Sequence, residues 1–556
     1  MVSLSGPAHG EPVRPLMVSL SRYAAACGLT NHGLTNHGRH RGSALLAWPW
    51  LLVGLVVAAC APSAAPPPAP SPASVAAGSV VRFAWDDAGL PTPFRVSTLG
   101  PDGLVLLSLL YDTLIWKDER GVIPWLATSW DVSADGRDYT LVLAHDVKWH
   151  DGQPLTADDV AFSFGYYAQH PFRWASTSMV ESATALAPDQ VRLRLRQPFA
   201  PFLENVLGVV PIIPRHVWSR VASPETYDGG DATLGSGPFT LAEYRSADAA
   251  YRLVANQDYF RGAVAVAEYQ QLNVPAATRI QAVQQGEVDL AWSVDASLAD
   301  LFKDNPRVKV ASTAPLSVVR LAVNTARAPL DRKEVRQAVA YALDRARIAE
   351  TATRDTPIVG SAGLVPPETP WFNPALPSYG FDPDRARSLL AGQTYTLELL
   401  ADPTYREPEL LEPMLKAVGI TLVIRRLDAK TRTQLLREGN FQLGEVQHLG
   451  VGGDPDFLSR WSVGDEANGF AQGWTFHDPA FERLASEQAA ATDPAARRQL
   501  VFRMQEILAD ELPTIPLYYR RFYWAYDSSR YTPFTTWGGL MDGIPFPQNK
   551  LSFLRR

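Results

Sequence analysis

The sequence predicts an α/β protein with at least two lobes. Helical and strand patterns interleave along the chain: a strand over Leu397–Leu400 is followed by a helix over 407–417 and a strand over Ile420–Ile424. The 556 residues exceed the length at which one hydrophobic core keeps growing. Because 46% of the residues are hydrophobic and 10% aromatic, there is enough apolar material for two cores and for the walls of a large binding site.

The N-terminal segment has the pattern of a signal peptide. Arg39 and Arg41 precede an apolar run over 44–57, which is short of the roughly 20 residues of a comfortable transmembrane helix. The run ends in Val57-Ala58-Ala59-Cys60, a small-residue exit before a cysteine that is typical of a lipobox. We therefore expect residues 1–59 to be removed and Cys60 to be acylated. The alternative is an ordinary signal peptide cleaved near Ala59.

The segment over 60–79 predicts a tether. It consists almost entirely of Ala, Pro and Ser, a composition that stays extended because it has little to bury. At about 3.1 Å per residue it spans roughly 50–60 Å, enough to hold a globular body above a membrane. Upstream, the pentapeptide Gly-Leu-Thr-Asn-His occurs twice over 28–37, so translation starts either at Met1, with a long leader, or at Met17 or later.

Charge and cysteine content exclude several classes of function. The formal net charge is −7, and the leader holds four arginines against one glutamate, so −10 remains for the rest of the chain. That balance argues against nucleic-acid binding. Cys27 lies in the leader, so Cys60 would be the only cysteine of the mature chain, and neither a disulfide nor a cysteine-based metal site is expected.

The first part of the mature chain predicts strands joined by tight turns. Val80–Trp85 is predicted as a strand and Leu104–Leu114 as a helix. Trp130–Val132 and Tyr139–Leu143 flank an Asp-Gly turn and predict a β-hairpin. The spacing of acidic residues there is also typical of a calcium loop, but the twelfth position is Val142 instead of glutamate, so a turn is favoured.

Further along, cap and turn residues mark several elements. Thr156, with Asp159 three residues later, predicts a helix start. Gly235–Phe239 predicts a tight turn before a strand over Thr240–Tyr244. Asp331 is expected to cap a helix over Val335–Leu343, and another helix is expected over Arg497–Leu508.

Four segments, in this order and spacing, resemble the dipeptide/oligopeptide-binding family of ABC transporter extracellular solute-binding proteins, family 5. They are Tyr139–Val160, Gly235–Phe239, Val335–Arg345 and Glu511–Tyr518. The resemblance covers nearly the whole mature chain. It implies a class II periplasmic-binding-protein clamshell, with two lobes of interleaved chain plus an extra domain.

The resemblance also implies domain boundaries. Lobe I is expected over 80–112, 234–326 and 516–556, the extra domain over 113–233, and lobe II over 327–515. Hinge strands are expected near Asn324 and Ile515. Because a ligand that bridges both lobes makes most of its contacts in the closed state, binding is expected to favour closure.

The segment over Gln447–Leu458 resembles the loop that faces the ligand in this family. Peptide-binding members place an aromatic residue there and, three positions later, an aspartate that holds the α-ammonium; the matching residues are His448 and Val451. A buried ammonium needs a carboxylate partner. Either Asp454 or Glu445 replaces it, or the ligand is uncharged, sugar-like or N-blocked. Asp454 is alternatively a helix cap.

The resemblance adds three further tentative ligand contacts and no catalytic group. Gln447, Asn468 and Trp474 are expected near the ligand, although Trp474 fits a core position equally well. His150 is interpreted as part of a structural turn with local hydrogen bonds, and Ser236 as a turn residue. The sequence contains no nucleophile elbow, no His-Glu-x-x-His helix and no P-loop, so no enzyme activity, cofactor or metal is expected.

The expected function is therefore extracytoplasmic capture of a peptide or peptide-like solute. The expected partners are that ligand, the ABC permease subunits and the membrane through the lipid anchor, with the protein itself a monomer. Two alternatives keep the same fold: a sensor for a membrane receptor, and a binder of a non-peptide solute such as an oligosaccharide or metal chelate. A hydrolase is a third, for which no nucleophile or metal site is found.

Overall fold

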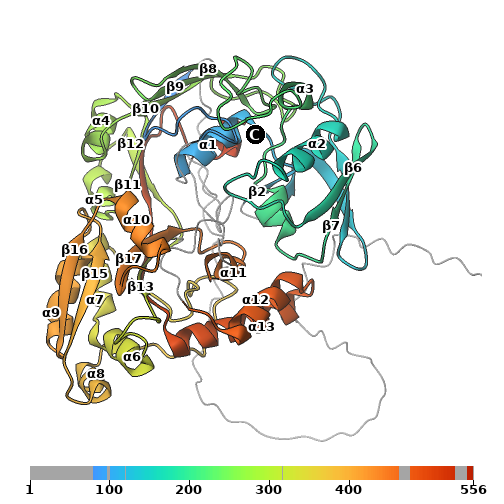
Figure 1. The fold of residues 1–556 in the computed structure, drawn as a ribbon. Coiled ribbons are helices and arrows are strands. Elements are labelled where there is room, and N and C mark those ends of the chain that lie inside the picture. Colours follow the sequence, from blue (N-terminus) through green and yellow to red (C-terminus); the bar gives the residue numbers. More distant parts are fainter. Residues whose placement is uncertain are drawn as a thin grey trace, which may run out of the picture. The chain divides into compact units, whose positions relative to one another are not determined.

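The computed structural model describes residues 79–96, 101–118, 121–315, 317–462, 476–532 and 548–554 (Figure 1). The chain divides into two units, Met1–Ala69 and Pro70–Arg556, and the description concerns the second. The predicted leader, Cys60 and most of the predicted tether lie outside the described residues. Among the described helices, none is both long and apolar enough to cross a membrane.

The first large sheet has seven strands in the order β12-β19-β11-β1-β10-β9-β8. The strands are β1 (Val80–Trp85), β8 (Phe239–Arg245), β9 (Ala250–Ala255), β10 (Glu268–Asn273), β11 (Leu290–Ser293), β12 (Val308–Ser312) and β19 (Tyr523–Asp527). β1 runs parallel to both of its neighbours, β10 and β11. One face is covered by α4 (Arg279–Gln285) and α5 (Ser297–Phe302), which bury small alanines of the sheet. The predicted first strand and the strand over Thr240–Tyr244 are confirmed.

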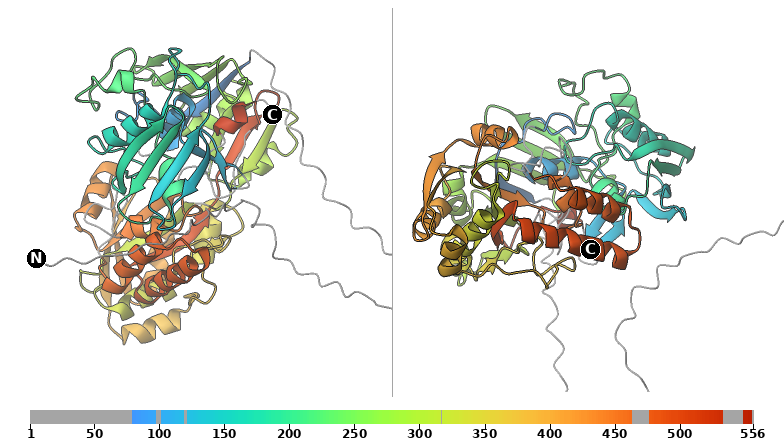
Figure 2. Two further views of the ribbon diagram at one scale, coloured as in Figure 1. Left: turned by 90° about the vertical axis from the view of Figure 1, so that its right-hand side faces the viewer. Right: turned by 60° about the horizontal axis from the view of Figure 1, so that its bottom comes forward.

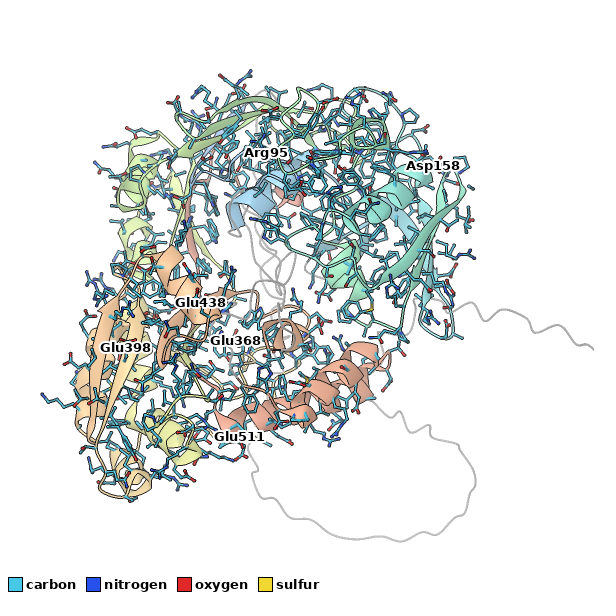
Figure 3. The ribbon with its side chains drawn as sticks, viewed as in Figure 1. Arg95, Asp158, Glu368, Glu398, Glu438 and Glu511 are labelled. Carbon is cyan, nitrogen blue, oxygen red and sulfur yellow. The ribbon has the colours of Figure 1, made fainter. Side chains whose placement is uncertain are left out.

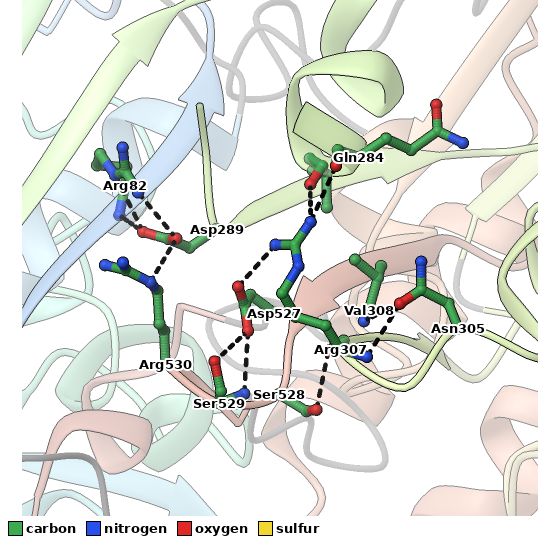
Figure 4. Close-up of polar contacts among 11 residues, drawn as sticks. Arg82, Gln284, Asp289, Asn305, Arg307, Val308, Asp527, Ser528, Ser529 and Arg530 are labelled. Carbon is green, nitrogen blue, oxygen red and sulfur yellow. Dashed lines mark hydrogen bonds and ion pairs between the residues drawn. The ribbon is translucent and has the colours of Figure 1, made fainter. Parts of the chain in front are cut away.

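Ion pairs between buried carboxylates and partly exposed arginines tie the central strands of this sheet together (Figure 4). The carboxylate of Asp289, almost fully buried, accepts the backbone N–H of Arg82 at 2.8 Å and the Arg82 guanidinium at 3.3 Å. Arg530 reaches the same carboxylate at 3.6 Å. Arg307 pairs with Asp527 at 2.7 Å. These contacts hold β1, β11 and β19 to the segment before β12.

The second large sheet has six strands in the order β14-β18-β13-β17-β15-β16. They are β13 (Ser317–Val323), β14 (Ile358–Val359), β15 (Tyr395–Ala401), β16 (Ile420–Arg426), β17 (Leu443–Leu449) and β18 (Thr514–Arg520). β15 is parallel to β16 and β17, whereas β13 is antiparallel to β17 and β18. The predicted strands over Leu397–Leu400 and Ile420–Ile424 are confirmed and are slightly longer than expected.

Helices cover both faces of the six-stranded sheet. Residues such as Val319 and Leu321 pack with α6 (Lys333–Ala342), α7 (Arg345–Thr353), α8 (Pro383–Leu390) and α9 (Glu407–Lys416). The alternate residues Val318 and Ala322 face the other way, towards α10 (Ala429–Arg437), α11 (Phe457–Ser462), α12 (Pro479–Ala490) and α13 (Pro494–Glu511). α12 and α13 lie side by side (Figure 1).

The helices start close to the predicted positions, but the residue predicted to cap one of them does not do so. α6 starts at Lys333 after Arg332, so the prediction that Asp331 caps it is wrong. The start of α6 is instead held by ion pairs. Glu511, at the end of α13, binds Arg336 at 2.8 Å and Lys333 at 3.1 Å (Glu511 is labelled in Figure 3). α13 is longer than predicted and begins after Asp493, whose carboxylate accepts the N–H of Ala496.

A four-stranded sheet in the order β4-β5-β7-β6 forms a separate layer (Figure 2). Its strands are β4 (Ala127–Val132), β5 (Asp138–Leu143), β6 (Val180–Ala187) and β7 (Gln190–Leu195), with α2 (Ala157–Tyr167) packed on it. Around it lie β2 (Ile115–Asp118), β3 (Gly121–Pro124), a π-helix over Leu203–Leu207 and α3 (Arg215–Trp218). Elsewhere, α1 (Pro101–Leu110) packs near β8, and 3₁₀ turns occur at Ala276–Thr278 and Lys550–Phe553.

Two predictions in this region are confirmed. The hairpin pairs Val132 with Tyr139, and Gly136 adopts φ +70°, a left-handed conformation that glycine tolerates. Thr156 caps α2, and the Asp159 carboxylate accepts its backbone N–H at 2.9 Å, which completes a capping box. The helix predicted over Leu104–Leu114 is α1, which ends four residues earlier than expected.

His150 is structural, but its hydrogen bonds are not local as predicted. Its Nδ1 accepts the N–H of Gly235 at 3.2 Å, and its Nε2 donates to the carbonyl of Gly237 at 3.1 Å. Burial lowers the pKa of this histidine, which agrees with the neutral form that the two bonds require. The loop of the four-stranded domain is thereby fixed to the turn that leads into β8.

Asp112 is the centre of a second link between segments. It is fully buried and binds Lys550 at 2.8 Å, which is also fully buried. The Asp112 carboxylate also accepts three hydrogen bonds. The donors are Trp125 Nε1 at 2.7 Å, the Tyr259 hydroxyl at 2.9 Å and the Ser236 hydroxyl at 3.1 Å. Ser236 is therefore a buried turn residue, in agreement with the sequence interpretation.

The two large sheets are joined by a two-stranded ribbon. β12 pairs with β19 in one sheet, and their continuations β13 and β18 pair in the other. Between them, Thr313 donates its N–H to the carbonyl of Phe522 at 2.9 Å, and the Phe522 N–H donates to Thr313 Oγ1 at 3.0 Å. In the described residues, the chain passes from one sheet to the other after β12, at 313–315, and between β18 and β19, at 521–522. The expected lobe boundary at 515 falls within β18, and that at 326 follows the end of β13 at Val323; both boundaries stay predictions.

Candidate functional site

The expected ligand-binding residues cluster on β17 and the loop after it, but on different faces. Gln447 and His448 are neighbours on the strand, so their side chains point to opposite sides of the sheet. Gln447 accepts a hydrogen bond from Arg520, the last residue of β18. Since parallel β-strands present ligands at their carboxyl ends, this end of β15, β16 and β17 is the favoured place for a binding site.

His448 is enclosed by protein. The residue is 8% exposed, and its ring packs at a tilt against Trp461 with 4.3 Å between ring centroids. Arg320 donates to its Nε2 at 3.1 Å. Burial and the positive charge of Arg320 hold the pKa of His448 well below its usual range, so the imidazole is neutral.

Val451 and Asp454 also contact other parts of the protein. Val451 is 1% exposed and packs in the core formed by α11, α12 and α13. Asp454 makes two hydrogen bonds of 2.6 Å to the guanidinium of Arg497 on α13, and both side chains are more than 90% buried. Its carboxylate also accepts the N–H of Asp456 at 2.9 Å. The charge of Asp454 is therefore already compensated.

Three expected residues cannot be placed in this geometry. Asn468, Trp474 and the lipidation residue Cys60 lie outside the described residues. In the part of the chain that the structure describes, no three His, Cys, Asp or Glu side chains are grouped so as to hold a metal ion.

Glu445, which the sequence suggested only as an alternative to Asp454, has the most unusual environment on β17. It is 0% exposed, and neither carboxylate oxygen has a hydrogen-bond partner among the described residues. Burial first, and the negative charge of Glu407 second, hold its pKa well above the usual range. The sequence could not predict that Glu445 is buried and unpaired, because strands and helices distant in the chain bury it.

An aromatic cluster lies across the crossing ribbon from β17. Trp85 stacks on Trp524 with 5.7 Å between centroids, and Trp292 packs edge-on to Phe522 at 5.6 Å. The buried indole N–H groups of Trp292 and Trp524 have no hydrogen-bond partner among the described residues. The guanidinium of Arg520 lies 5.6 Å from the ring of Phe522, so the cluster continues to Gln447 through Arg520. Sequence reasoning missed this cluster because its members come from three separate segments.

The four-stranded domain also contacts α12 and the connection that follows it, which belong to the helices packed on the six-stranded sheet. Ala200 donates its N–H to the carbonyl of Ala489 at the end of α12, at 2.6 Å. A Cβ at Gly136 would lie 3.3 Å from Thr492, in the connection between α12 and α13. The two sheets thus touch through this domain as well as through the ribbon.

A two-lobed α/β fold joined by a short ribbon, with an extra domain beside it, defines a solute-binding protein of the periplasmic-binding type. The model for bacterial extracellular solute-binding proteins, family 5, matches residues 121–470. The chain belongs to this family, whose members are substrate-binding components of ABC transporters and not enzymes.

Relatives in the family are named for different ligands. Heme-binding protein A of Haemophilus influenzae is 27% identical over 506 residues, covering 83% of this chain and 91% of its own. A probable di/tripeptide-binding protein 5 of Pseudomonas aeruginosa is 29% identical over 432 residues, covering 71% and 81%. The crystal structure of NikA from Brucella suis in complex with Fe(III)-EDTA matches with a TM-score of 0.73 and 25% identity, covering 84% and 99%.

Proposed function

We propose that this chain is the lipid-anchored binding component of an ABC importer, which captures a small peptide or peptide-like solute between two lobes and delivers it to the permease. The seven-stranded sheet forms most of lobe I and the six-stranded sheet most of lobe II, with 113–233 as the extra domain. In this proposal the lobes exchange chain at 313–315 and 521–522. The protein acts as a monomer outside the cytoplasm.

The observation that carries this proposal is the ribbon. Within the described residues, two adjacent chain crossings, at Thr313 and Phe522, connect the strands of the two sheets, and they are bonded to each other. Rotation about such a ribbon changes few dihedral angles while it moves each sheet as a rigid body. The carboxyl ends of the parallel strands, with Gln447 and Trp85, adjoin it, so a solute bound there contacts both lobes.

The chemistry of the solute is proposed from the same residues. Gln447 is the proposed polar contact, with Asn468 and Trp474 as further contacts; His448, Val451 and Asp454 shape the site from within the protein. Peptides are favoured because several relatives named for di- and tripeptides match the chain. A chelate or a planar solute is the second candidate, since a heme-binding relative covers 83% of this chain, the similar NikA structure is in complex with Fe(III)-EDTA, and Val451 replaces the expected aspartate.

The proposed lipid anchor rests on the lipobox-like sequence that ends at Cys60. Acylation at Cys60 and a tether over 60–79 would hold the lobes close to the permease. Two or three acyl chains give stable anchoring, whereas the tether has no apolar surface of its own.

Native mass spectrometry of protein purified without unfolding tests the proposal. A bound small molecule, released on denaturation and then re-bound at one equivalent per chain, is the expected result. A protein that carries no solute and binds none of a panel of di- and tripeptides, hemin and Ni(II)–histidine would contradict it.

A further inference from the structure

The hairpin between β4 and β5 has a buried tip, which is unusual for a tight turn. The preceding turn residues Ala134 and Asp135 are exposed, whereas Gly136 is buried. A Cβ placed at Gly136 would lie 3.4 Å from Pro198 of the same domain and 3.3 Å from Cγ2 of Thr492, in the connection between α12 and α13. Turns normally face water. The cover that Thr492 provides is therefore a contact between the four-stranded domain and the helices of the six-stranded sheet.

A backbone hydrogen bond joins the same two parts of the molecule. The N–H of Ala200, which follows Pro198 closely in the chain, donates to the carbonyl of Ala489 at 2.6 Å. Ala489 lies in the last turn of α12, where carbonyl groups have no partner within the helix. The four-stranded domain thus supplies a donor to the helix end, and the two backbones can approach because both residues are alanines.

The hairpin is held firmly on its own sheet. The hydroxyl of Ser133 accepts the N–H groups of Arg137 at 3.3 Å and Asp138 at 2.9 Å. The guanidinium of Arg137 donates to the carbonyl of Leu195 at 3.0 Å and to Glu181 at 3.1 Å. The turn tip is therefore fixed to the end of β7, and the segment that contacts α12 follows β7 directly.

A buried network fixes the helix end on the other side of the contact. Gln488 is 0% exposed and immediately precedes Ala489. Its side chain donates to Asp456 at 2.7 Å and accepts from Arg497 at 3.1 Å, and Arg497 pairs with Asp454. Asp454 and Asp456 belong to the loop after β17. The network therefore connects the end of α12 to the loop beside the proposed solute site.

A different contact between the lobes lies beside the ribbon. The N–H of Ala296, between β11 and α5, donates to the carbonyl of Thr353 at the end of α7, at 3.1 Å. β11 pairs with the ribbon strand β19. By contrast, α12 lies below β7, on the opposite side of the picture from β11 and β13 (Figure 1). Because rotation about the ribbon moves distant points furthest, it separates Ala200 from Ala489 much more than Ala296 from Thr353.

We propose that the closed state is held by a latch, made of Gly136 and Ala200 on the four-stranded domain and of Ala489 and Thr492 on lobe II. This inference rests on the proposed function and assigns a role to the extra domain, which is to determine how long a captured solute stays bound. The latch lies outside the proposed solute site. It stabilises the closed state whatever the solute is, so it should strengthen the binding of every solute by the same factor.

Hydrogen exchange at the Ala200 amide tests the latch directly. In the open state this N–H faces water, and in the closed state it is bonded to Ala489, so a bound solute should slow its exchange by about tenfold or more. The exchange is measured by mass spectrometry of a peptide fragment that contains Ala200, with the di- and tripeptides, hemin and Ni(II)–histidine as probes, one at a time. A fragment that contains Ala296 is the internal control and should change little.

Two matched variants test the effect on binding. Thr492→Trp places a bulky side chain against Gly136 and keeps the latch open, so the loss of the hydrogen bond and its packing should weaken the binding of each probe about tenfold, through faster dissociation. Thr394→Trp introduces the same side chain in the loop before β15 and should bind as wild type. Both threonines are exposed, so thermal unfolding without solute should be the same for the two variants and wild type.

The outcomes separate the latch from the proposed function. If a probe binds but exchange at Ala200 is the same with and without it, or if Thr492→Trp binds with wild-type affinity, the latch is overturned and capture between two lobes remains. A loss of affinity in Thr492→Trp that differs strongly from probe to probe also overturns the latch, because it indicates a direct contact with the solute. A protein that binds none of the probes overturns both.

Discussion

The substitution Asp454→Asn tests whether the Asp454 carboxylate has a structural role or a ligand-binding role. Asp454 and Arg497 are joined by two hydrogen bonds of 2.6 Å, with side chains 8% and 6% exposed. Removal of one partner from a buried pair leaves an uncompensated charge and costs about 3–5 kcal/mol. Among the described residues, Arg497 then keeps its hydrogen bonds to Gln488, at 3.0–3.1 Å, and the ring of Trp371 beneath it. We expect a loss of free energy of unfolding in that range.

Urea unfolding followed by tryptophan fluorescence measures this loss, since Trp371 and Trp461 belong to the affected core. The double variant Asp454→Asn/Arg497→Met should lose much less than the sum of the single variants, because a buried ion pair replaced as a whole is often neutral in stability. A loss below about 1 kcal/mol in the single variant, combined with a hundredfold loss of solute affinity, would refute the structural role.

Two further predictions concern the anchor and pH. Cys60→Ala should move the protein from the membrane to the soluble fraction, as seen by immunoblotting of fractionated cells, and retention in the membrane would contradict lipidation. The pKa of folded His448 is lowered, so below about pH 6.5 the unfolded chain binds more protons, and stability should decrease as pH falls, by at most about 1.4 kcal/mol per pH unit. His448→Gln should make thermal unfolding between pH 7.5 and 5.5 less pH-dependent than wild type; an identical dependence would contradict this.

Local patterns predicted much of the fold. The hairpin around Gly136 and the capped start of α2 at Thr156 were correct because turn and cap chemistry depends on residues a few positions apart. The same reasoning failed for Asp331, where the helix start is stabilised by long-range contacts to Glu511 instead. The lobe boundaries stay predictions, because strands that continue from one sheet into the other carry no local signal that marks a boundary.

The candidate site was less predictable, since it depends on long-range partners. The family pattern located β17 and the loop after it, but not that Asp454 pairs with Arg497, 43 positions later. Nor could it distinguish Glu445, whose burial depends on β13, β15 and α9. A glutamate in a strand is usually a solvated residue, so only packing identifies this one as buried and unpaired.

Small-angle X-ray scattering of solute-free and solute-saturated protein tests the central claim most directly, with the solute that the purified protein itself carries. Capture between two lobes that rotate about the ribbon predicts a smaller radius of gyration with solute. It also predicts a gain in stability of about 2.7 kcal/mol at a hundredfold excess over Kd. An unchanged scattering curve at saturation, with binding confirmed by calorimetry in the same sample, would contradict lobe closure.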